Sequence, residues 1–450
     1  MKKGMIFLFL LVWATPAMGA PNPTPNPAPN LAKGKALYEQ QCARCHGFDG
    51  KGDGIDAQRM YPKPRDFAAG TFKFRSTVSG TPPTDEDLFH TISRGLPGSR
   101  MPSFAQLSED MRRQLIAYVK EFSPIFKDAK PEPVALTPDP GAKAVDLAKG
   151  KKAYGDLGCA QCHGPSGRGN GPSAPTLVDN WGAPIRPADL THGFSYRAGS
   201  DPKSITLRVL TGIDGTPMPS YADAAGPEDI WQLAYYVQSL QEEPNFKEKV
   251  EVSKASGALP VTLADPAWAK IPRVGIRLSG NFYHEGKIAP TMIDSAFVQA
   301  VCDGEQIALR LVWHDPTESR QPPGDSIAIL LKPKSARGIV NALTWPAPES
   351  PSLDLILWSA EDHHVREVVA GNFPAAASDK SSGVELKSET SFNDGAWTLL
   401  IVRPLQSNTQ GAAAFSKSEP VPLALAAWDG GNQEAGRRRS ASTWVGLVLK

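Results

Sequence analysis

The chain has 450 residues, and its 48 basic and 47 acidic side chains give a formal net charge of +1 at pH 7. This balance argues against a nucleic-acid-binding protein and against a broad polybasic membrane surface, and the length suggests about three domains. Four of the five cysteines lie in two short motifs, which leaves no disulfide framework.

Residues 1–20 have the pattern of a secretory signal peptide. Lys2 and Lys3 precede an apolar run at 5–13, and small residues follow it. The run is too short for a membrane-spanning helix, and no later stretch approaches the roughly 20 apolar residues that a span needs. We expect a periplasmic protein without a transmembrane span in its mature chain. Residues 21–30, in which every second residue is proline, predict a stiff, hydrated lead.

One motif occurs twice, because Cys42-Ala43-Arg44-Cys45-His46 recurs as Cys159-Ala160-Gln161-Cys162-His163. A C-x-x-C-H sequence attaches a c-type haem: the two thiols bind the vinyl groups and the imidazole ligates the iron. Zinc would need further Cys or His ligands near each motif, and a thioredoxin-like site needs no histidine. The motifs therefore predict two covalent haems c, held by Cys42, Cys45, Cys159 and Cys162, with His46 and His163 as axial ligands.

A methionine follows each motif at the same distance. Arg100-Met101-Pro102-Ser103-Phe104 recurs as Pro217-Met218-Pro219-Ser220-Tyr221, and each Met lies 55 positions after the histidine of its motif. A thioether sulfur at a fixed distance can supply the second axial ligand. We therefore predict Met101 and Met218 as ligands, which leaves neither iron an open site for a substrate.

Each repeat is expected to form a small all-α cytochrome domain. A short helix opens each repeat before its haem motif, and an acidic helix start with an apolar stripe follows each methionine. The two domains are placed at 31–125 and 147–243, with a proline-marked linker at 126–146 between them. Gly95 and Gly212 are expected to allow a close approach of the backbone to the haem.

Four further residues between histidine and methionine are candidates for haem contacts or ligands. Arg75 and Arg197 occupy matching places, and we predict that they contact haem propionates; an exposed loop arginine is the alternative. His90 and His192 have no counterpart in the other repeat. They are expected to be surface or core residues and not ligands.

After a polar linker at 244–265, the sequence changes to a strand pattern. Residues 307–313 alternate between two faces, and Asp303-Gly304 predicts a hairpin turn before them. Several short strand-like runs without long helical patterns predict one antiparallel β-sandwich or barrel over 266–450. Cys302, in one of these runs, is expected to be a small core residue.

Two family resemblances add to this interpretation. Residues 31–243 resemble class I cytochrome c domains. The strand and turn sequences of the last domain are Gly324-Asp325-Ser326-Ile327-Ala328-Ile329, Asp394-Gly395-Ala396-Trp397, Arg403-Pro404-Leu405, Ala427-Trp428-Asp429-Gly430 and Ser442-Thr443-Trp444. From about residue 275 onward they resemble the haem-binding γ subunit of the ethylbenzene dehydrogenase type. Such subunits accompany periplasmic molybdopterin enzymes, including dimethylsulfide dehydrogenase and chlorate and selenate reductases, and related domains accompany nitrite oxidoreductases.

The resemblance implies a b-type haem between a Met and a Lys, and this chain departs from that pattern. The expected lysine falls near Arg439, and arginine has no free lone pair for iron. Met292, ahead of the first hairpin, is the only methionine in the domain. His314, His363 or His364 could replace the ligands, although adjacent His363 and His364 resemble a solvated turn. We therefore do not expect haem b in this domain, although these histidines are alternative ligands for it.

The predicted function is electron transfer by a dihaem cytochrome c that is a subunit or redox partner of a molybdopterin or iron–sulfur enzyme. A dihaem peroxidase, which needs an iron site that is open or can open, is one alternative. A ligand-binding β module is another, with Trp345, Trp358 or Trp397 as a platform for carbohydrate. Buried tryptophans explain these three residues more simply.

Overall fold

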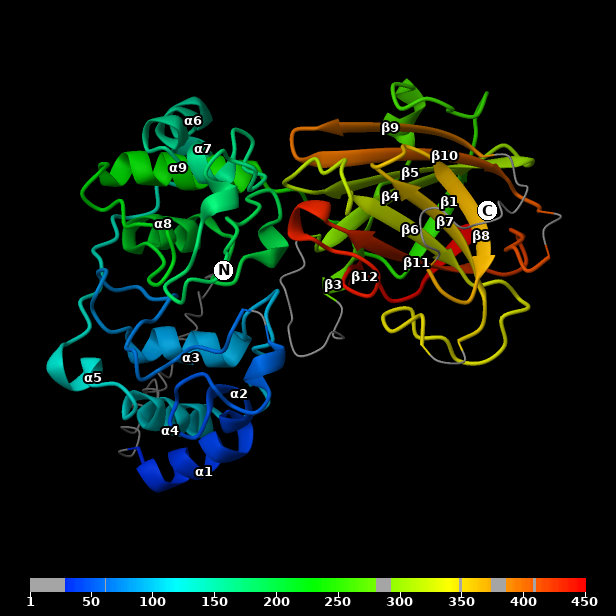
Figure 1. Cartoon of the computed structure of the whole chain (residues 1–450). Coiled ribbons are helices and arrows are strands. Elements are labelled where there is room, and N and C mark those ends of the chain that lie inside the picture. The colour runs from blue at the N-terminus through cyan, green and yellow to red at the C-terminus, as the bar shows by residue number, and fades with distance from the viewer. Residues whose placement is uncertain (1–28, 61, 281–292, 348–349, 374–385, 408–409) are drawn as a thin grey trace, which may run out of the picture.

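The computed structural model describes the chain from residue 29 onward, except residues 61, 281–292, 348–349, 374–385 and 408–409. The predicted signal peptide, most of the proline-rich lead and Met292 lie outside the described residues. Two helical domains are followed by a β domain (Figure 1). None of the helices in the described part of the chain combines the length and the apolar character that crossing a membrane requires.

The first helical domain is built from five α-helices, and hydrogen-bonding side chains cap the starts of the three longer ones. Asn30 caps α1, Thr84 forms a capping box with Asp87 at α3, and Ser108 caps α4. A 3₁₀ turn, η1 (Ala57–Arg59), lies between α2 and α3. The helices are α1 (Leu31–Gln41), α2 (Ala43–His46), α3 (Asp85–Arg94), α4 (Glu109–Lys120) and α5 (Ile125–Asp128).

The second helical domain repeats this order. Its helices are α6 (Leu147–Asp156), α7 (Ala160–His163), α8 (Pro202–Thr211) and α9 (Pro227–Ser239), with 3₁₀ turns η2 (Ala142–Ala144), η3 (Ala174–Thr176) and η4 (Gly193–Ser195). In each domain the first helix crosses the long helix that follows the methionine, α4 or α9, at a glycine. A Cβ on Gly34 would lie 2.3 Å from the carbonyl oxygen of Gln114, and one on Gly150 equally close to that of Gln232. The all-α expectation is incomplete, because each domain also contains an isolated β-bridge.

The described residues of the last domain form thirteen strands, ten of which follow one hydrogen-bonded path. The path runs β8 (Val365–Ala370), β7 (Leu353–Ser359), β6 (Ser326–Leu331), β11 (Val421–Trp428), β13 (Val445–Leu449), β1 (Lys249–Lys254), β4 (Ser295–Cys302), β5 (Gln306–His314), β10 (Ala396–Pro404) and β9 (Lys387–Asn393). The short strands β2 (Val274–Arg277), β3 (Ser279–Gly280) and β12 (Ser440–Ala441) pair outside this path, and two 3₁₀ turns, η5 (Pro266–Lys270) and η6 (Gly430–Asn432), complete the domain. The result is a mostly-β, barrel-like domain whose path is open between β8 and β9 in the described residues.

Two expectations for this domain need correction. The segment 244–265 was expected to be a linker, but it contains β1, which lies between β13 and β4 in the sheet. β1 is parallel to both neighbours, whereas the other strand pairs are antiparallel, so the domain is not purely antiparallel. The strand was not predicted because 244–265 is mostly polar and only Val250 and Val252 are buried in β1.

The path has two halves, one from β8 to β13 and the other from β1 to β9. One hydrophobic core contains residues of both halves. Trp313, Trp358 and Trp397 pack together at ring-centroid distances of 4.7–6.3 Å, and Trp345 lies in a second cluster. Trp345, Trp358 and Trp397, considered above as a platform for carbohydrate, are all buried. The prediction of a carbohydrate platform at these residues is therefore wrong. Cys302 is buried in β4, as expected for a core residue.

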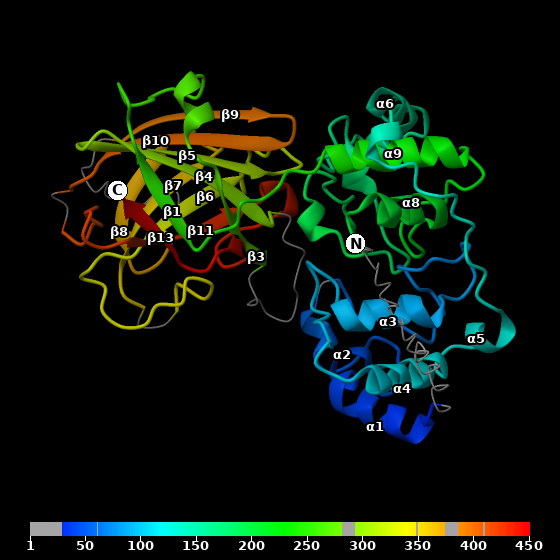
Figure 2. The ribbon, with the colours of Figure 1, turned by 180° about the vertical axis from the view of Figure 1, so that it is seen from behind.

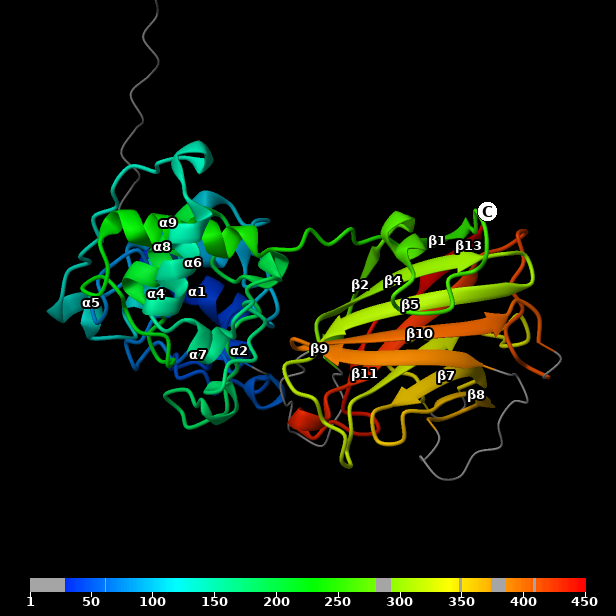
Figure 3. The ribbon, with the colours of Figure 1, turned by 90° about the horizontal axis from the view of Figure 1, so that it is seen from above.

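The second cytochrome domain lies between the first cytochrome domain and the β domain along the chain. In two views the first domain lies below the second, and the β domain lies beside them (Figures 1 and 2). Seen from above, an extended segment connects the helical half to the sheets (Figure 3). Both interfaces of the second cytochrome domain contain buried charged groups, which are described below.

The glycine at each helix crossing yields a stability prediction. Gly150→Ala should destabilise the second cytochrome domain by about 1–3 kcal/mol, because the new methyl group overlaps the backbone of α9. Gly155→Ala is the matched control, since it lies in the same helix and no atom lies within 4 Å of the position that its Cβ would take. That control should be neutral or stabilising by up to about 1 kcal/mol. Guanidinium unfolding of the haem-loaded protein, followed by circular dichroism, measures both; equal stabilities would contradict the close-packed crossing.

Candidate haem sites and domain interfaces

Each C-x-x-C-H motif forms a single helical turn. The amide of His46 donates to the carbonyl of Cys42 at 2.9 Å, and that of His163 donates to the carbonyl of Cys159 at 2.8 Å. Burial raises the pKa of the Cys42 thiol to about 12 and that of the Cys159 thiol to about 11. These surroundings favour uncharged sulfur, which suits the neutral thioethers of a covalent haem.

The two histidines are oriented in the same way. Nδ1 of His46 lies 3.0 Å from the carbonyl oxygen of Arg65, and Nδ1 of His163 lies 2.9 Å from that of Ala188. A carbonyl can only accept, so Nδ1 carries the proton and Nε2 keeps a free lone pair. Burial lowers the pKa of both imidazoles, which favours the neutral form that binds a metal. Both histidines therefore fit the axial position of a haem iron.

A glycine-containing turn holds the end of each motif helix. Gly47 and Gly164 have φ angles of 78° and 79°, in the left-handed region where glycine is favoured. Their carbonyls accept hydrogen bonds from the hydroxyls of Tyr38 and Tyr154, both at 2.7 Å. These buried tyrosines explain why the sequence has a Tyr at a matching place in each opening helix.

The two methionine loops are also fixed in the same way. The amide of Leu96 donates to the carbonyl of Met101 at 3.0 Å, and the amide of Ile213 donates to that of Met218 at 3.1 Å. Gly95 and Gly212 end the preceding helices, and a Cβ on either would lie 2.6–2.7 Å from backbone atoms of the methionine loop. These glycines were expected to allow a close approach of the backbone to the haem, and in the structure they allow a close approach to the loop that carries each methionine. Both methionines are partly buried.

Arg75 connects the two cytochrome domains. Its buried guanidinium forms an ion pair with Asp214 at 2.9 Å and donates to the carbonyl of Thr211 at 3.0 Å, in the segment that leads to Met218. Arg208 contacts the carbonyl of Arg75 from the second domain. Arg75, predicted as a propionate contact, therefore links the first domain to the methionine loop of the second.

Further basic side chains gather at this interface. Arg65 stacks over Trp181 with its Cζ 4.6 Å from the ring centroid. Burial, together with the nearby charges of Arg65 and Arg197, lowers the pKa of Lys73 to about 8. One guanidinium nitrogen of Arg65 is buried without a hydrogen-bond partner in the structure. Buried cations of this kind suit anionic haem propionates. The sequence alone pointed to Arg197 but not to Arg65 or Lys73.

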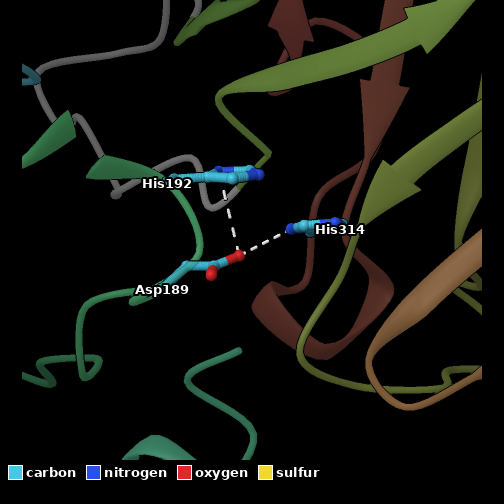
Figure 4. Close-up of side chains that lie close together, drawn as sticks. All are labelled: Asp189, His192 and His314. Carbon is cyan, nitrogen blue, oxygen red and sulfur yellow. Dashed lines mark hydrogen bonds and ion pairs between the residues drawn. The ribbon is translucent and has the colours of Figure 1, made fainter. Parts of the chain in front are cut away.

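The second cytochrome domain and the β domain meet at two histidines. Asp189 contacts both His192 and His314, and its Oδ2 is 2.7 Å from Nδ1 of His314 and 3.8 Å from Nδ1 of His192 (Figure 4). The two rings stack at 4.3 Å between centroids. His192 also pairs with Asp294 at 2.9 Å, so it is a buried residue of the domain junction. The exposed His90 pairs with Glu86 on its own helix.

The charges at this junction are mutually compensated. Burial alone would lower the pKa of His192, but the hydrogen bond to Asp294 and the charges of Asp294 and Asp189 raise it. Burial alone would raise the pKa of Asp189, but the hydrogen bond from His314 and the charge of His192 lower it well below its usual range. Burial lowers the pKa of His314, which contacts Arg168 as a neutral ring. His192 is therefore the cation that Asp189 and Asp294 stabilise.

The β domain also contacts the loop that follows the second haem motif. Arg168 forms ion pairs with Glu242 at 3.4 Å and with Asp394, in the β9–β10 turn, at 3.7 Å. Ser166 also hydrogen-bonds to Asp394. The first haem motif has different surroundings, since Phe48 and Ile55, in the loop after it, are 71% and 76% exposed.

The positions considered for a b-type haem are occupied by protein contacts. Arg439 is buried, contacts the carbonyl of Trp345 and lies 4.7 Å from the ring centroid of Phe373. His363 and His364 are exposed on the turn between β7 and β8, as the solvated-turn interpretation predicted. His314 is engaged with Asp189 and Arg168.

Comparison with known proteins agrees with the geometry of the helical domains. Residues 29–119 match the family model for subunit III of cbb3-type cytochrome c oxidase, and residues 147–241 match the model for cytochrome c. Over 187 residues the chain is 27% identical to a Haloferax mediterranei protein named as a respiratory nitrate reductase heme subunit, covering 40% of this chain and 64% of that protein. It is also 27% identical over 224 residues to subunit CcoP of a cbb3-type cytochrome c oxidase from an Azospirillum species, covering 47% and 62%.

A solved structure shows a similar match. The reducing HAO-like protein complex of Kuenenia stuttgartiensis contains a chain that is 43% identical, with a TM-score of 0.44, covering 47% of this chain and 96% of that one. The chain spans slightly under two thirds of the two curated relatives described above. Residues 29–241 of this protein therefore belong to the c-type cytochromes and bind two covalent haems c, and a mostly-β domain follows them.

Proposed function

We propose that this protein is a periplasmic electron-transfer cytochrome, in which His46 and Met101 ligate one haem and His163 and Met218 the other. The observation that carries the proposal is the repetition of one hydrogen-bond framework around both motifs and both methionine loops. Two axial protein ligands leave no position for a substrate, and a His/Met pair raises the potential of a haem. The chemistry that the haems supply is reversible one-electron transfer.

The interface between the cytochrome domains supports transfer from one haem to the other. Arg75 of the first domain contacts the segment before Met218, and Arg208, in α8 of the second domain, contacts the carbonyl of Arg75. Arg65, Lys73 and Arg197 supply further positive charge there. We propose that Arg197 and Arg65 balance the propionates, while Arg75 holds the two domains in register.

The domain arrangement assigns different roles to the two haems. The β domain covers the loop after the second motif through Arg168 and Asp394, whereas Phe48 and Ile55 stay exposed beside the first. Exposed apolar side chains are common at contacts between proteins. Electrons therefore pass to or from a redox protein at the first haem, and the β domain anchors the second haem domain in a larger complex.

The partner is proposed to be a molybdopterin or iron–sulfur oxidoreductase. The strand and turn sequences of the β domain resemble the γ subunits of such enzymes, and the names of two similar proteins refer to a nitrate reductase heme subunit and an HAO-like complex. Co-purification of the intact protein from its native host, followed by identification of the bound proteins, tests this assignment. Recovery of the cytochrome alone under gentle conditions would argue against a subunit role.

A haem-dependent enzyme is the competing function, and spectroscopy separates the two. The oxidised protein should show only low-spin haem, since both axial positions are filled in each site. Pyridine haemochrome analysis after acid–acetone extraction should find two covalent haems and no extractable haem. A high-spin fraction that reacts with peroxide would favour the peroxidase alternative, and one extractable protohaem per chain would place haem b in the β domain.

The methionine ligands can be tested one at a time. Met101→His and Met218→His should each lower the potential of one haem and leave the other nearly unchanged, because imidazole is a stronger donor than thioether. Each variant should also lose about half of the weak iron–sulfur charge-transfer absorption, since each haem contributes one such bond. Spectra that do not change in Met101→His would exclude Met101 as a ligand. Met111→His, on the first turn of α4, is the control and should behave as wild type.

The junction histidine predicts a pH dependence of stability. The raised pKa of His192 means that its stabilising contribution is complete below about pH 6.5 and is lost as the pH rises through its folded-state pKa. His314 has a lowered pKa, so it contributes a slope only below about pH 6.5.

The melting temperature of the β domain and second cytochrome domain should therefore fall as the pH rises above about 6.5, and His192→Asn should reduce this slope. His90→Asn, which replaces an exposed histidine, should leave it unchanged. Scanning calorimetry across this range provides the measurement. A slope that is the same in His192→Asn and wild type would remove His192 as its origin.

The anchoring role of the β domain predicts the effect of truncation. A chain that ends at residue 247, before β1, should keep both haem c spectra but bind its partner much more weakly. The truncated chain exposes charged junction residues, so Asp189→Asn and His192→Asn can be added to limit nonspecific binding. Partner binding that is as strong as in the full chain would assign docking to the cytochrome domains.

A further inference from the structure

Three aspartates that end or begin strands meet inside the β domain. Asp315 follows β5, Asp325 precedes β6 and Asp429 follows β11. All three are completely buried, and one carboxylate oxygen of each lies within 4.8 Å of the others. Asp325 and Asp429 belong to the turn sequences Gly324-Asp325-Ser326 and Trp428-Asp429-Gly430, which electron transfer does not use.

Hydrogen bonds satisfy only part of this cluster. Asp325 accepts from the amides of Ser319 and Gly430 and from the indole of Trp397, at 2.7–3.0 Å. Oδ1 of Asp315 accepts from the amide of Thr317 at 3.1 Å and from its hydroxyl at 3.3 Å, and Oδ1 of Asp429 accepts from the amide of Asn432 at 2.9 Å. The other oxygen, Oδ2, of both Asp315 and Asp429 is buried without any hydrogen-bond partner in the structure. A buried acceptor without a partner destabilises the folded state, and more so when it is charged.

The charge of the cluster is only partly compensated. Burial, and for Asp315 the charges of Asp429 and Asp325, raises the pKa of all three carboxyl groups. Glu434, whose pKa burial raises to about 8, hydrogen-bonds to the amide of Asp429. Arg186 of the second cytochrome domain is the cation that acts on Asp429. Protonation would remove charge, but it would still leave two buried Oδ2 atoms without partners.

We propose that Asp315, Asp325 and Asp429 bind one Ca²⁺ ion inside the β domain. Oxygens on opposite sides of a Ca²⁺ ion are about 4.6–5.2 Å apart, so the observed spacing suits a single ion. The ligands are all oxygens, which disfavours zinc and copper. Mg²⁺ usually keeps several waters, whereas Ca²⁺ accepts six to eight oxygens and suits a fully buried cluster.

The ion would join the two halves of the β path. β5 pairs with β4 and β10, whereas β6 and β11 pair with each other in the other half. His314, next to Asp315, carries the contact to Asp189 of the cytochrome domain. The Ca²⁺ site would therefore stabilise the sheet ends that hold the cytochrome junction. This inference is independent of the proposed electron-transfer function.

Calcium titration of the full-length, haem-loaded protein tests the proposal. After treatment with EGTA and buffer exchange, isothermal titration with CaCl₂ should show one site per chain, and Ca²⁺ should raise the melting temperature of the β domain. MgCl₂ should bind at least about tenfold more weakly. Bound Ca²⁺ replaces protons on the carboxyl groups, so the apparent affinity should fall as the pH is lowered.

The variants Asp315→Asn and Asp429→Asn should each weaken Ca²⁺ binding at least about tenfold. Asp354→Asn is the matched control: Asp354 is equally buried in the same domain but is paired with Arg403 at 3.5 Å, so calcium binding should persist. If the first two variants do not fold, the titration and the metal content of the wild-type protein decide. Absence of a wild-type response up to millimolar CaCl₂, or equal loss of binding in Asp354→Asn, would overturn the proposal.

Discussion

The hydrogen bond from each haem-motif imidazole to a backbone carbonyl is the constraint on which the cytochrome half depends. Arg65 and Ala188 supply these carbonyls from the segment after each motif, so the orientation of the ring depends on the path of a loop that is distant in sequence. Tyr38 and Tyr154 hold in place the glycine turn that follows each motif. A ring fixed at Nδ1 presents only Nε2, which is what a metal ligand requires.

Buried charge, and not apolar contact alone, orients the three domains. Arg75 and Asp214 join the two cytochrome domains, and Asp189 with His192 and His314 joins the second to the β domain. Such groups are costly to bury unless each finds a partner, so they specify one relative arrangement. The second cytochrome domain consequently contacts both neighbours, whereas the loop after the first motif stays exposed.

Several buried polar residues of the β domain lie at strand ends, outside its apolar core. The core contains tryptophans and aliphatic side chains, and its packing explains Trp345, Trp358 and Trp397 without a ligand. Asp315, Asp325 and Asp429 lie where strands stop, as does His314. The face that docks on the cytochrome domain and the proposed calcium site therefore share one end of the sheets.

The haem chemistry of this protein could be predicted from sequence because its residues lie at fixed, local spacings. C-x-x-C-H is a single helical turn, and repetition of the methionine at 55 positions identified the second ligand candidate without any tertiary information. The helix starts after each methionine and the long central strands were also predictable, from acidic residues and from periodicity. β1 was missed because its few buried residues lie among polar ones, and its parallel pairing depends on strands far away in the chain.

Only the tertiary structure determined the interaction partners of the isolated charged residues. Arg75 and Arg197 occupy matching places in the two repeats, and both were predicted to contact propionates. The partners of Arg75 in the structure, Thr211 and Asp214, are more than a hundred positions away in the sequence. His192 and His314, and likewise Asp315 and Asp429, become neighbours through domain docking or sheet pairing. No local pattern encodes such pairs, because the energy that brings them together comes from the burial of the surfaces around them.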